Sequence, residues 1–169
     1  FDSGQTEGPA SLPYYVMPFL EGETLRHRLE RDGPLPVDDA VRIALEVAEA
    51  LAYAHDHGVI HRDIKPENVL LSSGSAVVAD FGIARAQGVH ALTSTGMIVG
   101  TPRYMSPEQA AGTPELDGRS DLYSLGLIGY EMLAGATPFD ASTPADLVLQ
   151  RLSRDPPPLS PRAPEAPAW

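Results

Sequence analysis

The sequence predicts an α+β fold that is mostly helical, with a small amount of β-structure. Apolar side chains recur at helical spacing in residues 36–58, and residues 119–134 are apolar on most sides of a helix. Two short apolar runs, residues 69–71 and 76–79, flank the sequence SSGS and are typical of a β-hairpin. A chain of 169 residues, 43% of them apolar, has room for one domain with a buried core.

A strand and two helices are expected before the hairpin. The aromatic and β-branched run Tyr14–Met17 predicts the strand. A short helix is expected over Thr24–Glu30, ahead of a Gly-Pro pair that ends it. The long helix then begins at Pro36, a residue type favoured at helix starts, and closes at Gly58.

A loop, two helices and a tail are expected after the hairpin. Residues 82–106 are rich in Gly, Ser and Thr without a period, which is typical of a long loop. The helix over 119–134 is expected at the centre of the domain, and another helix is expected to begin at Pro144. Prolines crowd residues 155–169, so a proline-rich linker or disordered tail is expected to follow a domain of residues 1–154.

Charge and composition exclude several classes of function. Twelve basic against 23 acidic residues give a net charge of −11, the opposite of the basic surface that binds nucleic acid. No apolar run approaches the ~18 residues of a membrane span, so this segment is expected to make no membrane contact. The absence of cysteine excludes thiolate metal sites and is consistent with a cytoplasmic location, including the cytoplasmic part of a membrane-anchored protein.

One motif is specific enough to indicate chemistry. The pattern HRDxKxxN fixes five positions, His61, Arg62, Asp63, Lys65 and Asn68. The triplet DFG follows after a short interval, at Asp80, Phe81 and Gly82. The triplet alone is common by chance, so its value lies in the order and spacing of the two motifs.

These residues suit phosphoryl transfer, in which a protein mainly positions the reactants and neutralises charge. The Asp63 carboxylate can orient an attacking hydroxyl and accept its proton, and Lys65 can reach the migrating phosphoryl group. Asn68 and Asp80 supply the hard oxygen ligands that Mg²⁺ prefers. The predicted catalytic residues are therefore Asp63, Lys65 and Asn68, and the predicted magnesium ligands are Asn68 and Asp80.

Through these motifs the chain resembles the eukaryotic-type protein kinases, and among them the bacterial serine/threonine kinases, from about Tyr14 to about Arg154. HRDIKPEN is similar to the family's catalytic loop and DFG to its magnesium-binding turn. GTPRYMSPE, residues 100–108, resembles the end of the activation segment, although Ser106 stands where the family usually has alanine. The resemblance implies a protein-kinase-like fold, mainly the helical C-terminal lobe with the hinge and a remnant of the N-terminal lobe sheet.

The resemblance also implies a site for ATP with Mg²⁺. The stretch YYVMPFLEGETL would be the last strand of the N-terminal lobe and the hinge, with Met17 as gatekeeper. The carbonyl of Pro18 and the amide of Leu20 would meet the edge of the adenine, and Leu70 would form the floor beneath the ring.

Acceptor choice and activation are implied in the same way. Lys65 together with Thr101 resembles the serine/threonine signature, so protein substrates with serine or threonine hydroxyls are expected. Arg62 resembles the arginine that pairs with a phosphorylated activation loop, and Thr93 or Thr95 would carry that phosphate.

A last group of residues would have structural roles. His61 and Phe81 would pack together, and Gly82 would complete the magnesium-binding turn. Asp121 would brace the backbone of the catalytic loop from below. Glu108 would pair with an arginine that lies beyond this sequence.

Parts of the family's nucleotide site have no counterpart here. The glycine-rich loop, the ATP-anchoring lysine and its glutamate partner would precede Phe1, and Lys65 is the only lysine of the chain. The expected function is that of an ATP-dependent serine/threonine protein kinase, present as a fragment inactive on its own. Two alternatives are an inert kinase-like binding or regulatory fragment and a small-molecule phosphotransferase of related fold. The GTPRYMSPE segment, which forms a peptide shelf in the protein kinases, argues against the second alternative.

Overall fold

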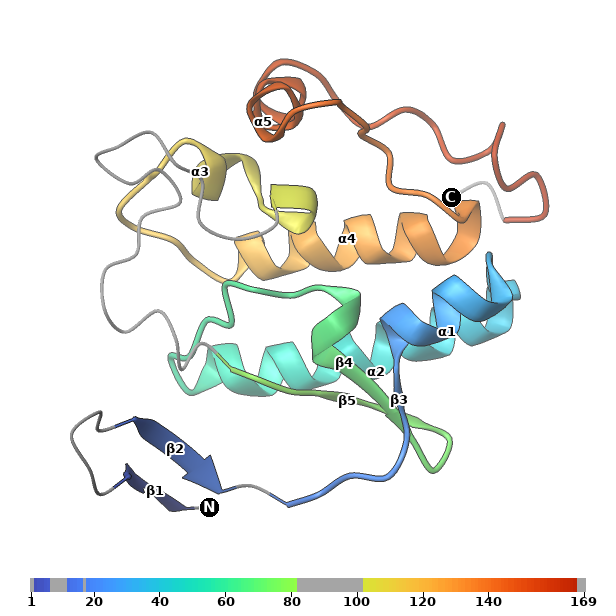
Figure 1. The fold of residues 1–169 in the computed structure, drawn as a ribbon. Coiled ribbons are helices and arrows are strands. Elements are labelled where there is room, and N and C mark those ends of the chain that lie inside the picture. The colour runs from blue at the N-terminus through green and yellow to red at the C-terminus, as the bar shows by residue number, and fades with distance from the viewer. Residues whose placement is uncertain (1, 7–11, 17, 82–101, 167–169) are drawn as a thin grey trace.

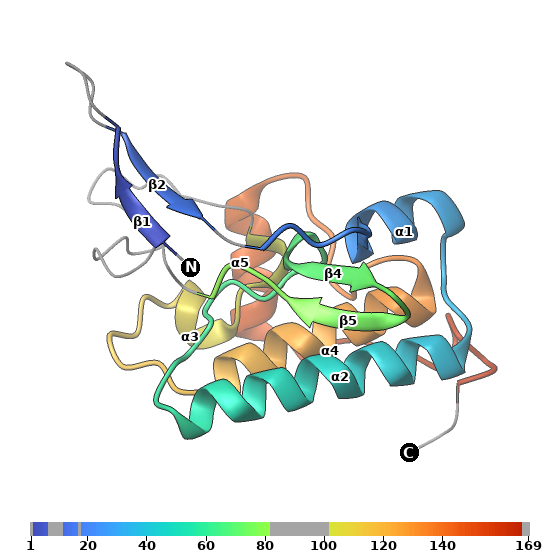
Figure 2. The same ribbon diagram turned by 90° about the horizontal axis from the view of Figure 1, so that it is seen from below.

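The computed structural model describes residues 2–6, 12–16, 18–81 and 102–166, and it confirms a mostly helical α+β fold. Two long helices, α2 (Val37–Asp56) and α4 (Arg119–Ala134), lie side by side across the molecule (Figures 1 and 2). Helix α4 lies between α2 and α5 (Pro144–Ser153) in Figure 1. Among the described residues, no helix has the length and apolar character needed to cross a membrane.

The core lies where α2 faces α4. The buried residues of α2 recur every three or four positions and so line one face of the helix, as Ala40, Ile43, Val47, Leu51 and Ala54. Helix α4 contributes Leu127, Ile128 and Met132 to the same core. It has the predicted bounds and ends at Gly135, whose φ of 73° is left-handed and therefore favours glycine.

A three-stranded antiparallel sheet lies against α2. Strands β4 (Val69–Ser72) and β5 (Ser75–Val78) form the predicted hairpin, with bounds that differ from the prediction by one residue. Ser73 and Gly74 make the turn with φ of 51° and 86°, the positive values that a two-residue hairpin turn requires. Strand β3 (Glu23–Thr24) pairs with the other edge of β4.

A second hairpin stands apart from this body in both views of the ribbon (Figures 1 and 2). Strand β2 (Pro13–Val16) overlaps the predicted strand, and it pairs antiparallel with β1 (Asp2–Gln5), which the sequence did not predict. Gly4 lies opposite Tyr14, and a Cβ on Gly4 would lie 2.7 Å from the Tyr14 hydroxyl. A glycine at this position lets the tyrosine ring lie over β1.

Side-chain caps begin the two shorter helices. Helix α1 (Leu25–Asp32) starts one residue after the predicted position, because Thr24 is its cap and accepts a hydrogen bond from the amide of His27 at 3.2 Å. Helix α5 begins at Pro144 as predicted. Its cap is Thr143, whose hydroxyl oxygen accepts from the amide of Asp146 at 3.1 Å.

The predicted long loop over 82–106 lies largely outside the described residues, which resume at 102. Here the short 3₁₀ helix η3 (Pro102–Tyr104) is followed by α3 (Pro107–Ala110), a helical turn that the sequence did not predict. The described part of the tail, residues 155–166, contains turns and neither helix nor strand. Its fixed proline φ angles and missing amide donors account for this.

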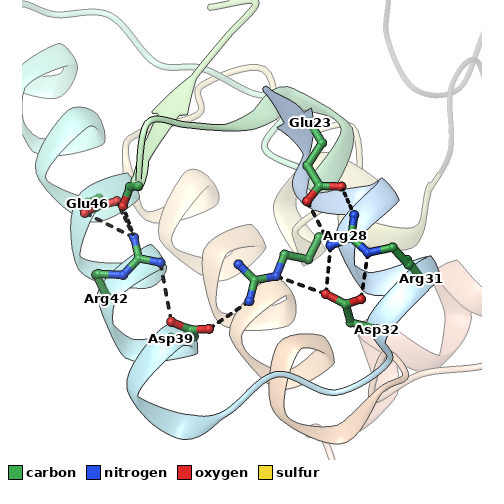
Figure 3. Close-up of polar contacts among 8 residues, drawn as sticks. Glu23, Arg28, Arg31, Asp32, Asp39, Arg42 and Glu46 are labelled. Carbon is green, nitrogen blue, oxygen red and sulfur yellow. Dashed lines mark hydrogen bonds and ion pairs between the residues drawn. The ribbon is translucent and has the colours of Figure 1, made fainter. Parts of the chain in front are cut away.

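Ion pairs join α1 to α2 (Figure 3). Arg28 of α1 donates to Asp39 of α2 at 2.9 Å and lies 3.4 Å from Asp32 of its own helix. Asp39 in turn lies 3.6 Å from Arg42, one turn further along α2. The acidic start of α2 therefore connects the two helices and also suits the positive end of the helix dipole.

The same set of charges holds the β4–β5 hairpin onto α2. Arg42 donates to the carbonyl of Gly74 in the hairpin turn at 2.7 Å. Glu46, one turn later, lies 3.4 Å from the Arg42 guanidinium and accepts a hydrogen bond from the amide of Ala76 at 2.5 Å. Two side chains of one helix thus hold the turn and the first part of β5.

We expect Glu46→Ala to lower the free energy of unfolding by about 1–3 kcal/mol, because the amide of Ala76 would lose its acceptor. Urea denaturation of the purified protein measures the effect. The matched control is Glu49→Ala, an exposed position on the same helix, which should change stability by less than about 0.5 kcal/mol. Equal effects of the two variants would contradict the role given to Glu46.

Candidate active site

A buried carboxylate fixes the segment that carries the HRDxKxxN residues. Asp121, in the first turn of α4, is only 1% exposed. Its Oδ2 accepts from the backbone amide of His61 at 2.9 Å, and its Oδ1 accepts from that of Arg62 at 2.7 Å. Arg62 has a φ of 67°, a conformation that costs energy for a residue other than glycine. The two charge-assisted hydrogen bonds stabilise this turn of the chain.

His55 is a third partner of Asp121, and sequence reasoning missed it. At the end of α2 a histidine is expected to face solvent, but His55 Nε2 lies 2.7 Å from Asp121 Oδ2. A Cβ on Gly118 would lie 2.5 Å from Nδ1 of the same ring, so a glycine at this position leaves room for the imidazole. The signal that could have indicated the contact is the glycine at position 118, three residues before Asp121.

The three predicted catalytic residues lie together. The Asp63 side chain is about half exposed, and its Oδ2 accepts from Lys65 Nζ at 2.8 Å. Asn68 is 7% exposed and donates from Nδ2 to the Asp63 carbonyl at 2.8 Å and to Oδ2 at 3.3 Å. Because the amide nitrogen of Asn68 faces Asp63, its amide oxygen is the atom left to face a cation.

The end of β5 brings Asp80 next to this group. The amide of Ala79 donates to the carbonyl of Asn68 at 2.8 Å, and the carbonyl of Ala79 lies 3.0 Å from His61 Nε2. The rings of His61 and Phe81 are in contact, with centroids 4.8 Å apart. Asp80 lies between these anchors with a φ of 59° and an exposed side chain. Among the described residues, no three histidine or acidic side chains are grouped so that they could hold a metal ion.

Gln109 connects α3 to the loop that carries the HRDxKxxN residues, and the sequence did not indicate this role. Its Nε2 donates to the carbonyl of Arg62 at 2.7 Å, while its Oε1 accepts from the amide of Ser106 at 2.9 Å. The Ser106 hydroxyl accepts in return from the amide of Gln109 at 3.3 Å. This reciprocal capping box could have been read from the spacing of the two residues.

A buried network links α1, η3 and α4. Arg26 donates to both carboxylate oxygens of Glu131, at 3.1 and 3.2 Å, and to the hydroxyl of Tyr104. The Tyr104 hydroxyl donates to Glu131 at 2.5 Å. Arg26 also reaches Glu67, within the 3₁₀ helix η1 (Pro66–Asn68) of the loop, at 3.3 Å. Burial, reinforced by the Glu131 carboxylate, raises the pKa of the Tyr104 hydroxyl, which therefore remains a donor.

Glu108 has a partner inside the described structure. The Ser120 hydroxyl, at the start of α4, donates to Glu108 Oε1 at 2.5 Å. Burial acts to raise the pKa of Glu108, but the hydrogen bond from Ser120, together with others from its own backbone and Ser106, lowers it below the ordinary glutamate value. Glu108 thus joins α3 to α4 without the arginine expected from the sequence.

Comparison with known proteins identifies the family. A family profile described as the protein kinase domain matches residues 8–157. The chain belongs to the protein kinase family. Its fold agrees: the chain superposes on the kinase domain of a mutant form of Mycobacterium tuberculosis PknI with a TM-score of 0.69 and 33% identity, covering 95% of this chain and 55% of that one.

The curated relatives are bacterial serine/threonine kinases. The chain is 44% identical over 165 residues to serine/threonine-protein kinase PknB of Mycobacterium leprae, covering 96% of this chain and 26% of the relative. It is 42% identical over 160 residues to PknA of Corynebacterium glutamicum, covering 93% of this chain and 34% of the relative. The chain therefore spans between a quarter and a third of the length of these kinases.

Of the other residues that the resemblance to kinases implies, the structure describes some and leaves the rest outside its described ranges. Pro18 and Leu20 are exposed on the segment that leads from β2 to β3. Leu70 is half-buried and lies opposite Thr24 and Val77 in the sheet. The other expected positions lie outside the described residues, namely Met17, Gly82, Thr93, Thr95 and Thr101.

The lowered pKa of Glu108 predicts a pH-dependent contribution to stability. A carboxyl with a depressed pKa stabilises the fold above its unfolded pKa, near 4.5, and loses that contribution as pH falls through its folded value. We therefore expect Ser120→Ala to lower the free energy of unfolding more at neutral pH than in acid.

Urea denaturation of wild type and variant, at neutral pH and at a pH below the ordinary glutamate pKa, measures the change in the free energy of unfolding under each condition. The control is Ser142→Ala, at an exposed loop position, which should change stability little at either pH. If the loss caused by Ser120→Ala were the same at both pH values, Ser120 would not be what lowers the Glu108 pKa.

Proposed function

We propose that the protein containing this chain transfers the γ-phosphoryl group of ATP to serine or threonine hydroxyls of proteins, and that residues 1–154 are part of its catalytic domain. The observation that carries the proposal is the arrangement of one loop. Asp63, Lys65 and Asn68 share hydrogen bonds, and Asp121 holds the backbone just before them. Asp80 follows Ala79, whose amide donates to the Asn68 carbonyl.

In this proposal each side chain has one task. The Asp63 carboxylate accepts a hydrogen bond from the substrate hydroxyl, orients its oxygen and takes its proton as the bond from that oxygen to the γ-phosphorus forms and the bond from the γ-phosphorus to the departing ADP breaks. Lys65, which pairs with Asp63 here, moves its charge to the transferred phosphoryl group. The oxygen donors of Asn68 and Asp80 fit Mg²⁺, which when bound with ATP neutralises phosphate charge.

The remaining sites are proposed from the resemblance. Met17, Pro18, Leu20 and Leu70 would line the adenine site. Thr101 would act with Lys65 in the choice of serine or threonine. Phosphate on Thr93 or Thr95 would pair with Arg62, whose backbone amide is held by Asp121. Use of ATP and a cysteine-free composition support a cytoplasmic location.

Two observations weigh against the alternative functions. Asp63, Asn68 and Asp80 are all present and grouped, which is unexpected in an inert binding fragment. The segment from η3 to α3 is tied to the catalytic loop through Gln109, which favours a surface for a peptide chain over a small-molecule phosphotransferase.

We expect Asp63→Asn in the full-length protein to reduce phosphoryl transfer by at least about 100-fold, because the amide cannot accept the substrate proton. Transfer from labelled ATP to a protein substrate measures the rate, and circular dichroism checks the fold. The control is Asp56→Asn, at the exposed end of α2, which should retain the wild-type rate. A folded Asp63→Asn variant with near-normal turnover would remove Asp63 from its role.

Residues 1–169 by themselves should not transfer phosphate. Lys65 is the only lysine of this sequence, and it already pairs with Asp63, so the second lysine that anchors the ATP phosphates in protein kinases must come from other sequence. The measurement is magnesium-dependent autophosphorylation of this purified segment beside the full-length protein. Clear activity of the segment would contradict the need for that anchor.

A further inference from the structure

The backbone carbonyls of three successive residues in and after η3 are each held by a side chain. The guanidinium of Arg151, on α5, donates from Nη2 to the carbonyl of Arg103 and from Nη1 to that of Met105. Between them, the Ser124 hydroxyl, on α4, donates to the carbonyl of Tyr104 at 2.7 Å. Buried carbonyls of irregular backbone need donors from elsewhere, and here two helices supply them.

Arg151 is an unexpected residue for this task. It is 4% exposed, and within the described residues no carboxylate pairs with it and its Nε has no hydrogen-bond partner. Its guanidinium carbon lies 5.9 Å from the centre of the Phe139 ring. Burial lowers the pKa of Arg151 to about 10, which reflects the cost of enclosing its charge. An apolar side chain would avoid that cost if α5 only had to pack here.

The backbone that Arg151 holds borders the catalytic loop. The same stretch continues through Ser106 into α3, where Gln109 donates to the carbonyl of Arg62, immediately before Asp63. A protein substrate whose hydroxyl reaches Asp63 must lie along the chain segments next to that loop. Residues 103–105 are connected to that loop by Gln109 and by Arg26, which donates to Tyr104 and reaches Glu67.

We propose that Arg151 is a positioning residue for the protein substrate: together with Ser124, it holds the backbone of residues 103–105, of which Tyr104 and Met105 are buried, and this backbone supports the surface on which the acceptor peptide lies. The inference rests on the proposed kinase function and adds a residue outside the HRDxKxxN and DFG motifs. Because the contacts of Arg151 in the described part of the chain are with Arg103, Met105 and Phe139, its loss should affect the peptide and leave ATP binding unchanged.

The test compares steady-state kinetics of Arg151→Met, Arg151→Lys and wild type in the full-length protein. The probes are ATP and a synthetic peptide with a single threonine that the wild type phosphorylates. We expect Arg151→Met to raise KM for the peptide about tenfold, with KM for ATP within about twofold of wild type. Arg151→Lys keeps one donor group and should recover part of the loss.

Arg154→Met is the matched control, because Arg154 ends the same helix with an exposed side chain. It should leave both KM values unchanged. If Arg151→Met does not fold, Arg151→Lys carries the test, with a rise in peptide KM expected and an unchanged one contradicting the proposal.

The outcomes separate the inference from the function on which it rests. A lower melting temperature with both KM values unchanged would make Arg151 merely structural and overturn the inference. An equal rise of both KM values would overturn it as well. Failure of the wild type to phosphorylate any peptide would instead refute the proposed kinase function.

Discussion

The carboxylate of Asp121 is the contact on which the geometry of the site depends. A buried carboxylate is tolerated only when donors surround it, and His55 together with the amides of His61 and Arg62 provides them. The carboxylate in turn holds the chain in the strained turn that leads directly into Asp63. Since Asp121 lies on helix α4, which contributes to the core, the loop that carries Asp63 is positioned by a buried part of the fold.

The other irregular segments are held in the same manner. Side chains on regular helices reach out and satisfy backbone groups of loops, as Glu46 does for the β4–β5 hairpin and Gln109 for the catalytic loop. Functional residues can therefore lie on loops, where side chains are accessible, without the loops having secondary structure of their own. The helices are held by the packed core, and hydrogen bonds from their polar side chains hold the loop backbone in place.

Much of this could be predicted from sequence because the signals are local. The sequence predicts the helix over 119–134 with its observed bounds, since its apolar character and terminal glycine lie within one segment. Contacts between distant segments carry no such signal. His55 and Asp121 are 66 positions apart, and strand β1 has a turn-like composition that becomes a strand only through pairing with β2.

The most direct test is a structure of the full-length protein with Mg²⁺ and a non-hydrolysable ATP analogue. The account predicts a cation bound by the oxygens of Asn68 and Asp80, with the Asp63 carboxylate facing the terminal phosphate and Asp121 still bonded to the amides of His61 and Arg62. A cation held elsewhere, with these three side chains turned away from the nucleotide, would contradict it.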